Sequence, residues 1–498
     1  MKRVFIVGFL CLLTLTMIGQ SVFSQELQQQ PAPTLVPPTL VPTQDAGVFD
    51  TIPSESGIAR IVRDGVVRVG ILYNEVPFGL LNIRNEVAGY DADLARSMAE
   101  QWGVQVEFVQ VTRQTAIDTL RSGQVDLLIA AMVHRRDLDS LVEFSQMYAL
   151  SSQSLMVRVD DSAQTLADMA NRRVGVVIGT PSESAVTSWQ ARTGTVATVQ
   201  SYLTLSQAVT ALLTNEVDGV VSTRTRLLRS VNQPETVRIL DEPVAPEPYA
   251  VAVRRQDVNL RNLVNRTLQF LVRNGRLLEI HEANMPEVPF REETLAIWAN
   301  LGDEAPRPDQ FPTDITIPQQ YILPRVMNDR VLRVAGVLDS VTPETPVATQ
   351  RIDALNRAMV ETMAARWGVT VEYVPESASN PLEFVANGQA DIAVGVPADW
   401  SWADRVDFTQ GYFMRGYRLM VEQDSDITSF SGLRSLTVAT DLDDPNAITL
   451  LQAEAQEANV RIETFQTNDA AYAILVDLNA NVAFGDALWL LPAAGFLL

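Results

Sequence analysis

The sequence repeats itself at a separation of 265 residues, as the differences 329 − 64, 367 − 102 and 391 − 126 show. The residues that recur are Asp64 and Asp329, Trp102 and Trp367, and Asp126 and Asp391. Neighbouring stretches agree as well, since Val66–Val69 returns as Val331–Val334. A period this long exceeds the roughly 20 to 50 residues of a stacked repeat unit and matches the size of a domain. The sequence therefore predicts a domain duplicated in tandem.

Composition limits the fold and the partners. The chain has 498 residues, of which 47% are hydrophobic, enough to bury two ordinary cores. Its formal net charge of −22 opposes binding to nucleic acid and to anionic membrane surfaces, because these carry charge of the same sign. We therefore expect no nucleic-acid partner.

The first residues are typical of an export signal. Lys2 and Arg3 precede the apolar run Val4–Ile18, which is short for a bilayer span. We expect residues 1–24 to be a cleaved signal peptide and the protein to be periplasmic or extracellular; the alternative is an uncleaved signal that tethers it to the membrane. Cys11 is the only cysteine of the chain, so the exported protein would contain no disulfide and no cysteine-bound metal.

The remaining chain divides into four segments. Residues 25–57 are rich in glutamine and proline and form a linker. The first domain is expected at 58–287, a proline-rich connector at 288–324, and the second domain at 325–498. Nothing in the second half corresponds to residues 237–285, so we expect the second domain to be incomplete, or completed by something outside this sequence.

Strand and helix patterns alternate in the first half. Strands are predicted at residues 66–72, 104–109 and 173–178, and helices at 91–102 and 182–192. This alternation predicts an α/β fold with largely parallel strands. Ligands of such sheets lie beyond the carboxyl ends of the strands.

Several motifs of the first half stand in the order and spacing of one protein family. They are Val66-Val67-Arg68-Val69-Gly70, Val76-Pro77-Phe78, Gly89-Tyr90-Asp91-Ala92-Asp93-Leu94, Val217-Asp218-Gly219-Val220-Val221 and Glu247-Pro248-Tyr249-Ala250-Val251. Through them the first half resembles the extracellular solute-binding proteins of the amino-acid-binding family, which have the periplasmic binding protein type 2 fold. The resemblance spans almost all of residues 66–285, and the second half is similar to a degenerate copy.

The resemblance implies a two-lobed α/β domain. Lobe I would comprise about residues 66–152 and 250–287, and lobe II about 153–249, with chain crossings near 151–157 and 249–253. A small polar solute, amino-acid-like or an organic anion, would be enclosed between the lobes by hinge closure, without catalysis. The implied partner is the permease of an ABC importer.

The residues expected at this cleft lie at strand ends and in the loops that follow them. They are Glu75, Phe78, Ala131, Met132, His134, Arg135, Arg136, Thr180, Ser182, Thr223 and Arg224. Phe78 either stacks on the solute or packs in the core. Thr180 and Ser182 stand at the start of a predicted helix, where they hold a carboxylate, cap the helix, or do both.

Two positions depart from the family pattern. Leu138 stands where the family has the arginine that pairs with the ligand carboxylate, so either Arg135 or Arg136 supplies the cation or the cation is lost. Thr223, followed by Arg224, stands where the family has the acid that binds the ligand ammonium. We therefore expect the first cleft to prefer an anionic or neutral solute over a standard α-amino acid.

The second half departs further from the family. Its candidate ligand residues are Trp400, Trp402 and Asp486, of which Asp486 stands at the position of the ammonium-binding acid. Further acids accompany them: Asp399, Asp441, Asp443 and Asp444. If this half binds a solute, we expect a cation. The alternative, which we favour, is a copy that folds and binds nothing.

Motifs of catalysis and cofactor binding are absent from the sequence. His134 and His281 are the only histidines, and the chain contains no Gly-x-Ser-x-Gly, no Gly-x-Gly-x-x-Gly and no cluster of metal-binding residues. We expect no catalytic residue, no metal and no cofactor. The main alternative to a transport protein is a ligand sensor or interaction scaffold outside transport, and an enzyme is more remote.

Overall fold

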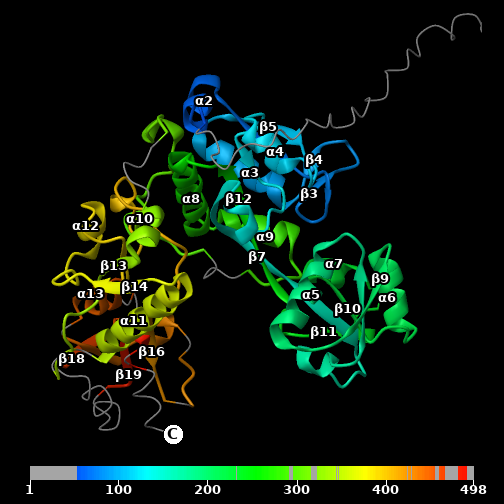
Figure 1. Cartoon of the computed structure of the whole chain (residues 1–498). Helices are drawn as coiled ribbons and strands as arrows, with labels where there is room; N and C mark the ends of the chain where they lie inside the picture. Colours follow the sequence, from blue (N-terminus) through cyan, green and yellow to red (C-terminus); the bar gives the residue numbers. More distant parts are fainter. Residues whose placement is uncertain are drawn as a thin grey trace, which may run out of the picture. The chain divides into compact units, whose positions relative to one another are not determined.

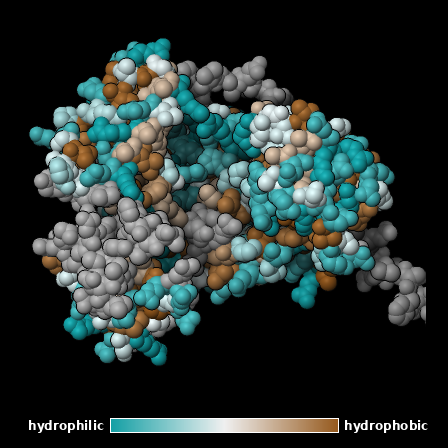
Figure 2. Space-filling model, turned by 90° about the horizontal axis from the view of Figure 1, so that it is seen from below, coloured by the Kyte–Doolittle hydropathy of each residue, from teal (hydrophilic) through white to brown (hydrophobic). Residues whose placement is uncertain are grey.

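The computed structural model describes residues 53–490, except 232, 291–294, 316–321, 344, 346, 423, 428, 443, 455–458, 466–479 and 489. The predicted signal peptide, most of the predicted linker and Asp443 lie outside these residues. In the described ranges, no helix combines the length and apolar character that crossing a membrane requires. Figure 2 shows hydrophilic residues over most of the face drawn, in keeping with the formal net charge of −22.

One mixed sheet extends through the first half of the chain (Figure 1). Its strands are β1 Val66–Ile71, β5 Gln105–Gln110, β6 Leu127–Leu128, β7 Val142–Arg158, β8 Arg173–Val177, β9 Thr198–Tyr202, β10 Gly219–Thr223, β11 Val237–Ile239 and β12 Ala245–Arg254. Their order is β5-β1-β6-β12-β7-β10-β8-β9, with β11 beside β7. The groups β5-β1-β6 and β10-β8-β9 are parallel, which confirms the predicted α/β fold.

Helices and separate cores divide this sheet into two lobes. The helices are α2 Gly57–Asp64, α3 Tyr90–Trp102, α4 Ala116–Arg121, α5 Pro181–Thr193, α6 Leu205–Leu213, α7 Arg224–Arg229, α8 Val258–Arg273 and α9 Arg276–Asn284. In lobe I, α3 buries Leu94, Met98 and Trp102, which recur at helical spacing. In lobe II, α5 and α6 contribute to two different clusters of buried side chains around β7, β8 and β10.

Strands β7 and β12 connect the two lobes. They pair antiparallel from Val142 with Arg254 to Gln153 with Ala245, so one ladder of hydrogen bonds passes from lobe I into lobe II. The register shifts twice, on either side of Ala250, which marks irregular pairing where the chain crosses. The predicted crossings at 151–157 and 249–253 lie within these two strands.

The second half contains the same strands in two separate sheets. The elements are α10 Ile322–Asp329, β13 Val331–Ala335, α11 Val347–Trp367, β14 Thr370–Tyr373, α12 Pro381–Ala386, β15 Ile392–Ala393, β16 Tyr417–Met420, β17 Thr437–Asp441, α13 Pro445–Glu454, β18 Arg461–Phe465 and β19 Val482–Asp486. The sheet orders β14-β13-β15 and β16-β19-β17-β18 correspond to β5-β1-β6 and β7-β10-β8-β9.

The register of the first sheet is also the same in both halves. Val66 pairs with Gln105 in β1 and β5, and Val331 pairs with Thr370 in β13 and β14, with a shift of 265 at both positions (331 − 66 and 370 − 105). Among the described residues, no strand joins the two sheets of the second half as β12 joins the lobes. The segment 406–415, which corresponds to the first part of β7, accordingly forms no strand.

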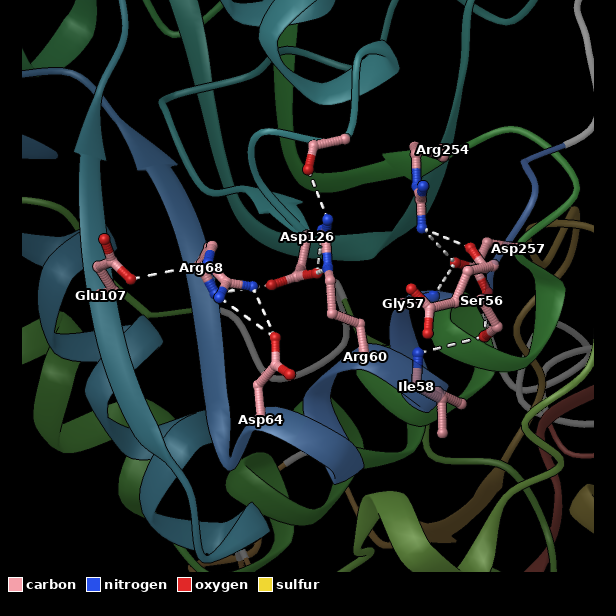
Figure 3. Close-up of polar contacts among 12 residues, drawn as sticks. Ser56, Gly57, Ile58, Arg60, Asp64, Arg68, Glu107, Asp126, Arg254 and Asp257 are labelled. Atoms are coloured by element: carbon pink, nitrogen blue, oxygen red, sulfur yellow. Dashed lines mark hydrogen bonds and ion pairs between the residues drawn. The ribbon is translucent and has the colours of Figure 1, made fainter.

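A buried carboxylate anchors the start of β1, and an equivalent one anchors β13. Asp126 accepts a hydrogen bond from the Arg68 backbone nitrogen at 2.8 Å and pairs with Arg60. Figure 3 shows Asp126 between these two arginines. In the second half, Asp391 accepts from the Arg333 backbone nitrogen at 2.7 Å and pairs with Arg325. The same contact therefore holds the parallel strands together twice.

We expect Asp126→Ala to destabilise the first half by about 3 to 5 kcal/mol, because it leaves the Arg60 charge partly buried without a partner. The midpoint of urea denaturation, measured on the full chain, checks this. Asp391→Ala is the matched change and should lower the stability of the second half instead. An unchanged urea midpoint for Asp126→Ala would show that the ion pair contributes little.

Candidate functional site

Charged side chains from the two lobes meet at Glu75. Glu75 follows β1 in β2 Asn74–Glu75, a strand of a small sheet with β3 Gly79–Leu81 and β4 Val87–Ala88. Its carboxylate pairs with Arg113 of lobe I at 2.7 Å and with Arg226 of lobe II. Two guanidinium groups thus share one carboxylate, which leaves one positive charge of this group uncompensated. Neither arginine was predicted as a site residue, because Arg113 lies 38 residues and Arg226 151 residues from Glu75 along the chain.

A second polar network crosses the hinge at Gln153. The Gln153 Nε2 donates to Glu247 Oε1 at 2.7 Å and to Thr223 Oγ1 at 3.0 Å, and its Oε1 accepts from Ser182 Oγ at 2.7 Å. The Tyr249 hydroxyl donates to Glu247 Oε2 at 3.1 Å. The structure therefore brings together two predicted site residues, Ser182 and Thr223, and places Glu247 beside them.

Glu247 is a site candidate that the sequence did not single out. It is 5% exposed, and burial raises the pKa of its carboxyl, while hydrogen bonds from Gln153, Tyr249 and Thr223 oppose this rise. The only signal in the sequence is its place in the motif Glu247-Pro248-Tyr249, next to a predicted crossing. That motif indicates the hinge but does not show that the carboxylate faces lobe II.

Phe78 lies in the core of lobe I. Its ring is 2% exposed and its centroid lies 4.3 Å from that of Tyr249 and 6.1 Å from that of Tyr90. Of the two alternatives open from the sequence, this position favours packing. Through Tyr249, the ring also supports the hinge network around Glu247.

The loop after β6 is held by backbone contacts to the hinge and to α3. Ala131 has a positive φ of 46°, and its nitrogen donates to Asp91 Oδ2 at 2.7 Å. The Met132 carbonyl accepts from the Ala250 nitrogen at 2.9 Å, and the His134 nitrogen donates to the Pro248 carbonyl at 2.9 Å. These contacts place the start of the loop beside β12, at the crossing.

The arginines of this loop lie at the surface. Arg135 is exposed and pairs with Asp137 two residues later, and Arg136 is exposed without an ion pair in the described part of the chain. The ring of His134 stacks on Phe144 at 4.4 Å and contacts Asp139. Leu138 packs against the core of lobe I. The cations that the sequence offered as substitutes for the family arginine thus have surface positions.

The start of α5 already has an acid of its own. Thr180 precedes the helix, and its hydroxyl donates to the Val177 carbonyl at 2.7 Å instead of capping. The Gly179 nitrogen donates to Glu183 Oε2 at 2.8 Å. A protein carboxylate therefore already occupies one backbone amide at this turn. Arg224, at the start of α7, makes no ion pair with any described residue.

Asp91, at the start of α3, is a fully buried acid that contacts the loop after β6. It is 0% exposed, accepts from the Tyr148 hydroxyl at 2.7 Å and positions Ala131. Burial raises the pKa of its carboxyl to about 7, against these hydrogen bonds. The second half has the neutral Asn356 at the equivalent position, where Asn356 Oδ1 accepts from the Tyr412 hydroxyl at 2.7 Å.

We expect the stability of the first half to depend on pH through Asp91. The pKa of this group is raised on folding from 3.8 to about 7, so its contribution is complete below pH 3.8 and is lost as the pH rises through 7. The free energy of unfolding of Asp91→Asn, minus that of the wild type, should therefore be higher at pH 8 than at pH 5, by roughly 1 kcal/mol or more. Urea denaturation at both pH values measures this, with Asp93→Asn as a surface control. If the stability difference between Asp91→Asn and the wild type does not change with pH, the raised pKa of Asp91 is contradicted.

Trp400 of the second half belongs to a junction with lobe I. It is 7% exposed, its ring lies 4.4 Å from that of Trp298, and its Nε1 donates to Gln269 Oε1 of α8 at 2.8 Å. The Trp298 backbone nitrogen donates to the same oxygen at 2.9 Å, and Arg266 lies over the Trp400 ring. A side chain of the protein, Arg266, therefore already contacts the indole ring on which we expected a ligand cation to stack.

The other second-half candidates also have protein partners. Arg405 lies over the Trp402 ring at 4.8 Å. Asp486 is 7% exposed, pairs with Arg415 at 2.7 Å and accepts from the Leu488 nitrogen at 2.8 Å. Asp399 accepts from Asn300 and from the Ser401 nitrogen. These contacts do not bring Trp400 and Asp486 together.

We expect Trp400→Ala to destabilise the second half by about 3 kcal/mol, because it removes a large buried ring and leaves Gln269 without one donor. Trp402→Ala is the control and should cost less, since its ring is only partly buried. Thermal unfolding of the full chain, followed by calorimetry, compares the two. Equal losses of stability in the two variants would indicate that the junction does not depend on Trp400.

Comparison with known proteins places the site in a family context. Residues 67–287 match the model of the bacterial extracellular solute-binding proteins, family 3. Similar proteins include a glutamine-binding protein of Geobacillus stearothermophilus, 26% identical over 42% of this chain and 80% of the relative. Another is an ABC transporter glutamine-binding protein of Bacillus subtilis, which is 25% identical over 47% of this chain and 85% of its own length. Among solved structures, an ancestral arginine-binding protein bound to arginine is 31% identical; the match covers 44% of this chain and 98% of that protein, with a TM-score of 0.37.

Proposed function

Because residues 67–287 form a domain of the bacterial extracellular solute-binding proteins, family 3, we propose that this protein is exported and captures a small polar solute. The solute, amino-acid-like or an organic anion, lies between lobe I and lobe II and is delivered to the permease of an ABC importer. The observation that carries this proposal is the meeting of polar groups from both lobes and the hinge, at Glu75 and Gln153.

Hinge closure is the proposed means of capture. The lobes share only a narrow ladder in β7 and β12, and two ion pairs from α7 reach lobe I, Arg226 to Glu75 and Arg229 to Glu287. A solute that contacts both lobes lowers the free energy of the closed state alone and shifts the population toward it.

We further propose that the two halves are a tandem duplication. The proposed boundaries are 25–57 for the linker, 58–287 for the first domain, 288–324 for the connector and 325–498 for the second domain. The equal strand orders and the shared register of β1 with β5 and β13 with β14 support this. The second domain would bind no solute of its own, because Trp400 and Asp486 already have protein partners.

A ligand sensor or interaction scaffold is the second candidate function. The junction of Trp298, Trp400 and Gln269 favours it, because it attaches the second half to α8, a helix that packs against β7. Such a contact can relay closure of the first domain. Loss of uptake of the identified solute in a strain that lacks this protein would support transport over sensing.

We expect a thermal-shift screen of the full chain against amino acids, dicarboxylates, polyamines and sugars to identify a stabilising solute. At a hundred times its Kd, a ligand adds about 2.7 kcal/mol to the stability of the domain that binds it. Arg113→Ala should weaken binding of an identified solute, whereas Arg96→Ala, an exposed arginine of α3, should not. Absence of a shift with every class would contradict the proposed function.

A further inference from the structure

The carboxylate of Glu247 is buried at the hinge without an ion pair. Its side chain belongs to β12, is 5% exposed, and forms no ion pair with any residue in the described part of the chain. A buried charge without a counter-charge is costly, and proteins usually pair such groups. The Arg113 charge acts on this carboxylate without forming an ion pair. The position therefore favours either a neutral carboxyl group or a further cation in direct contact.

The hydrogen bonds of Glu247 match its ionised form. Gln153 donates through Nε2 at 2.7 Å and Tyr249 through its hydroxyl at 3.1 Å. The Gln153 amide is oriented by Ser182, which donates to its Oε1. Both contacts thus direct donors at the carboxylate, an arrangement suited to an acceptor-only group. A protonated carboxyl group would have to direct its own hydrogen elsewhere.

The other carboxylates of the region already have partners. Glu75 pairs with Arg113 and Arg226, and Asp91 accepts from Tyr148 and Ala131 in the interior of lobe I. Among these three, Glu247 alone combines a position at the hinge with the absence of an ion pair or a backbone donor in the described part of the chain, and the Arg113 charge acts on it only through space.

Glu247 also adjoins the position that lost its acid. Gln153 donates to both Glu247 and Thr223 through the same nitrogen, and the Thr223 hydroxyl itself acts on the carboxylate, so the two groups are neighbours. A solute at the end of β10 that reaches Thr223 would therefore lie close to Glu247. The group of Glu75, Arg113 and Arg226 has one excess positive charge, which suits a carboxylate of the same solute.

We propose that Glu247 determines solute specificity by receiving a protonated amine of the bound solute, in place of the acid that Thr223 replaces. This inference rests on the proposed function, since it places the solute in the first cleft. It reverses the expectation drawn from Thr223 alone, which favoured an anionic or neutral solute. A solute with both an ammonium and a carboxylate group would then compensate both the Glu247 charge and the excess charge near Arg113.

Calorimetric titration of the full chain tests this with pairs of probes that differ only in the α-ammonium group: L-glutamate with glutarate, and L-norvaline with valerate. We expect the wild type to bind the ammonium-bearing member of at least one pair more tightly. Glu247→Gln should raise the Kd of that member by roughly 10- to 100-fold and change the Kd of the deaminated member by no more than about twofold. Tighter binding of glutarate or valerate by the wild type would overturn the inference and leave the proposed function intact.

Two further results separate specificity from folding. Thr223→Asp, added to Glu247→Gln, returns an acid to the neighbouring position and should restore binding of the ammonium-bearing probe. Equal weakening of both members of a pair by Glu247→Gln, without rescue, would assign Glu247 a structural role and overturn the inference. A wild type that binds none of the probes and none of the solutes in the thermal-shift screen would overturn the proposed function, and this inference with it.

Discussion

The antiparallel pairing of β7 with β12 is the interaction on which the rest of the first half depends. These strands carry the sheet from lobe I into lobe II, and the residues that meet at the hinge, Gln153 and Glu247, lie on them. In the second half the equivalent sheets are separate in the described part of the chain, and segment 406–415 forms no strand. A strand without a neighbour cannot satisfy its backbone groups, so the loss of one pairing removes both the ladder and the hinge.

Contacts between distant parts of the chain arrange the charges near the hinge. Glu75 joins an arginine from each lobe, so lobe closure and charge compensation are coupled. Glu247 has only neutral donors, which leaves it available to a cation from outside. The region therefore offers separate places for a negative and a positive group of one solute, although both charged positions of the family pattern are altered.

Comparison of the two halves shows which contacts they share and where they differ. The buried carboxylates Asp126 and Asp391 make equivalent contacts, because each accepts a hydrogen bond from the backbone nitrogen of the third residue of a parallel strand. The loops differ instead. After β6 the loop contacts the hinge at Ala250, whereas after β15 the loop carries Trp400 into a junction with α8. Loops accept such changes because their backbone groups do not depend on a ladder.

The sequence alone determined the long repeat, the alternation of strands and helices and the family of the first half, because these depend on periodicity and on fixed spacing along the chain. It also identified Ser182 and Thr223, which the structure brings together through Gln153. Only the tertiary structure decided which side chain compensates which charge. Arg226 lies 151 residues from Glu75, and Glu247 lies 94 residues from Gln153. Contacts over such separations arise from packing of the lobes, which no local pattern records.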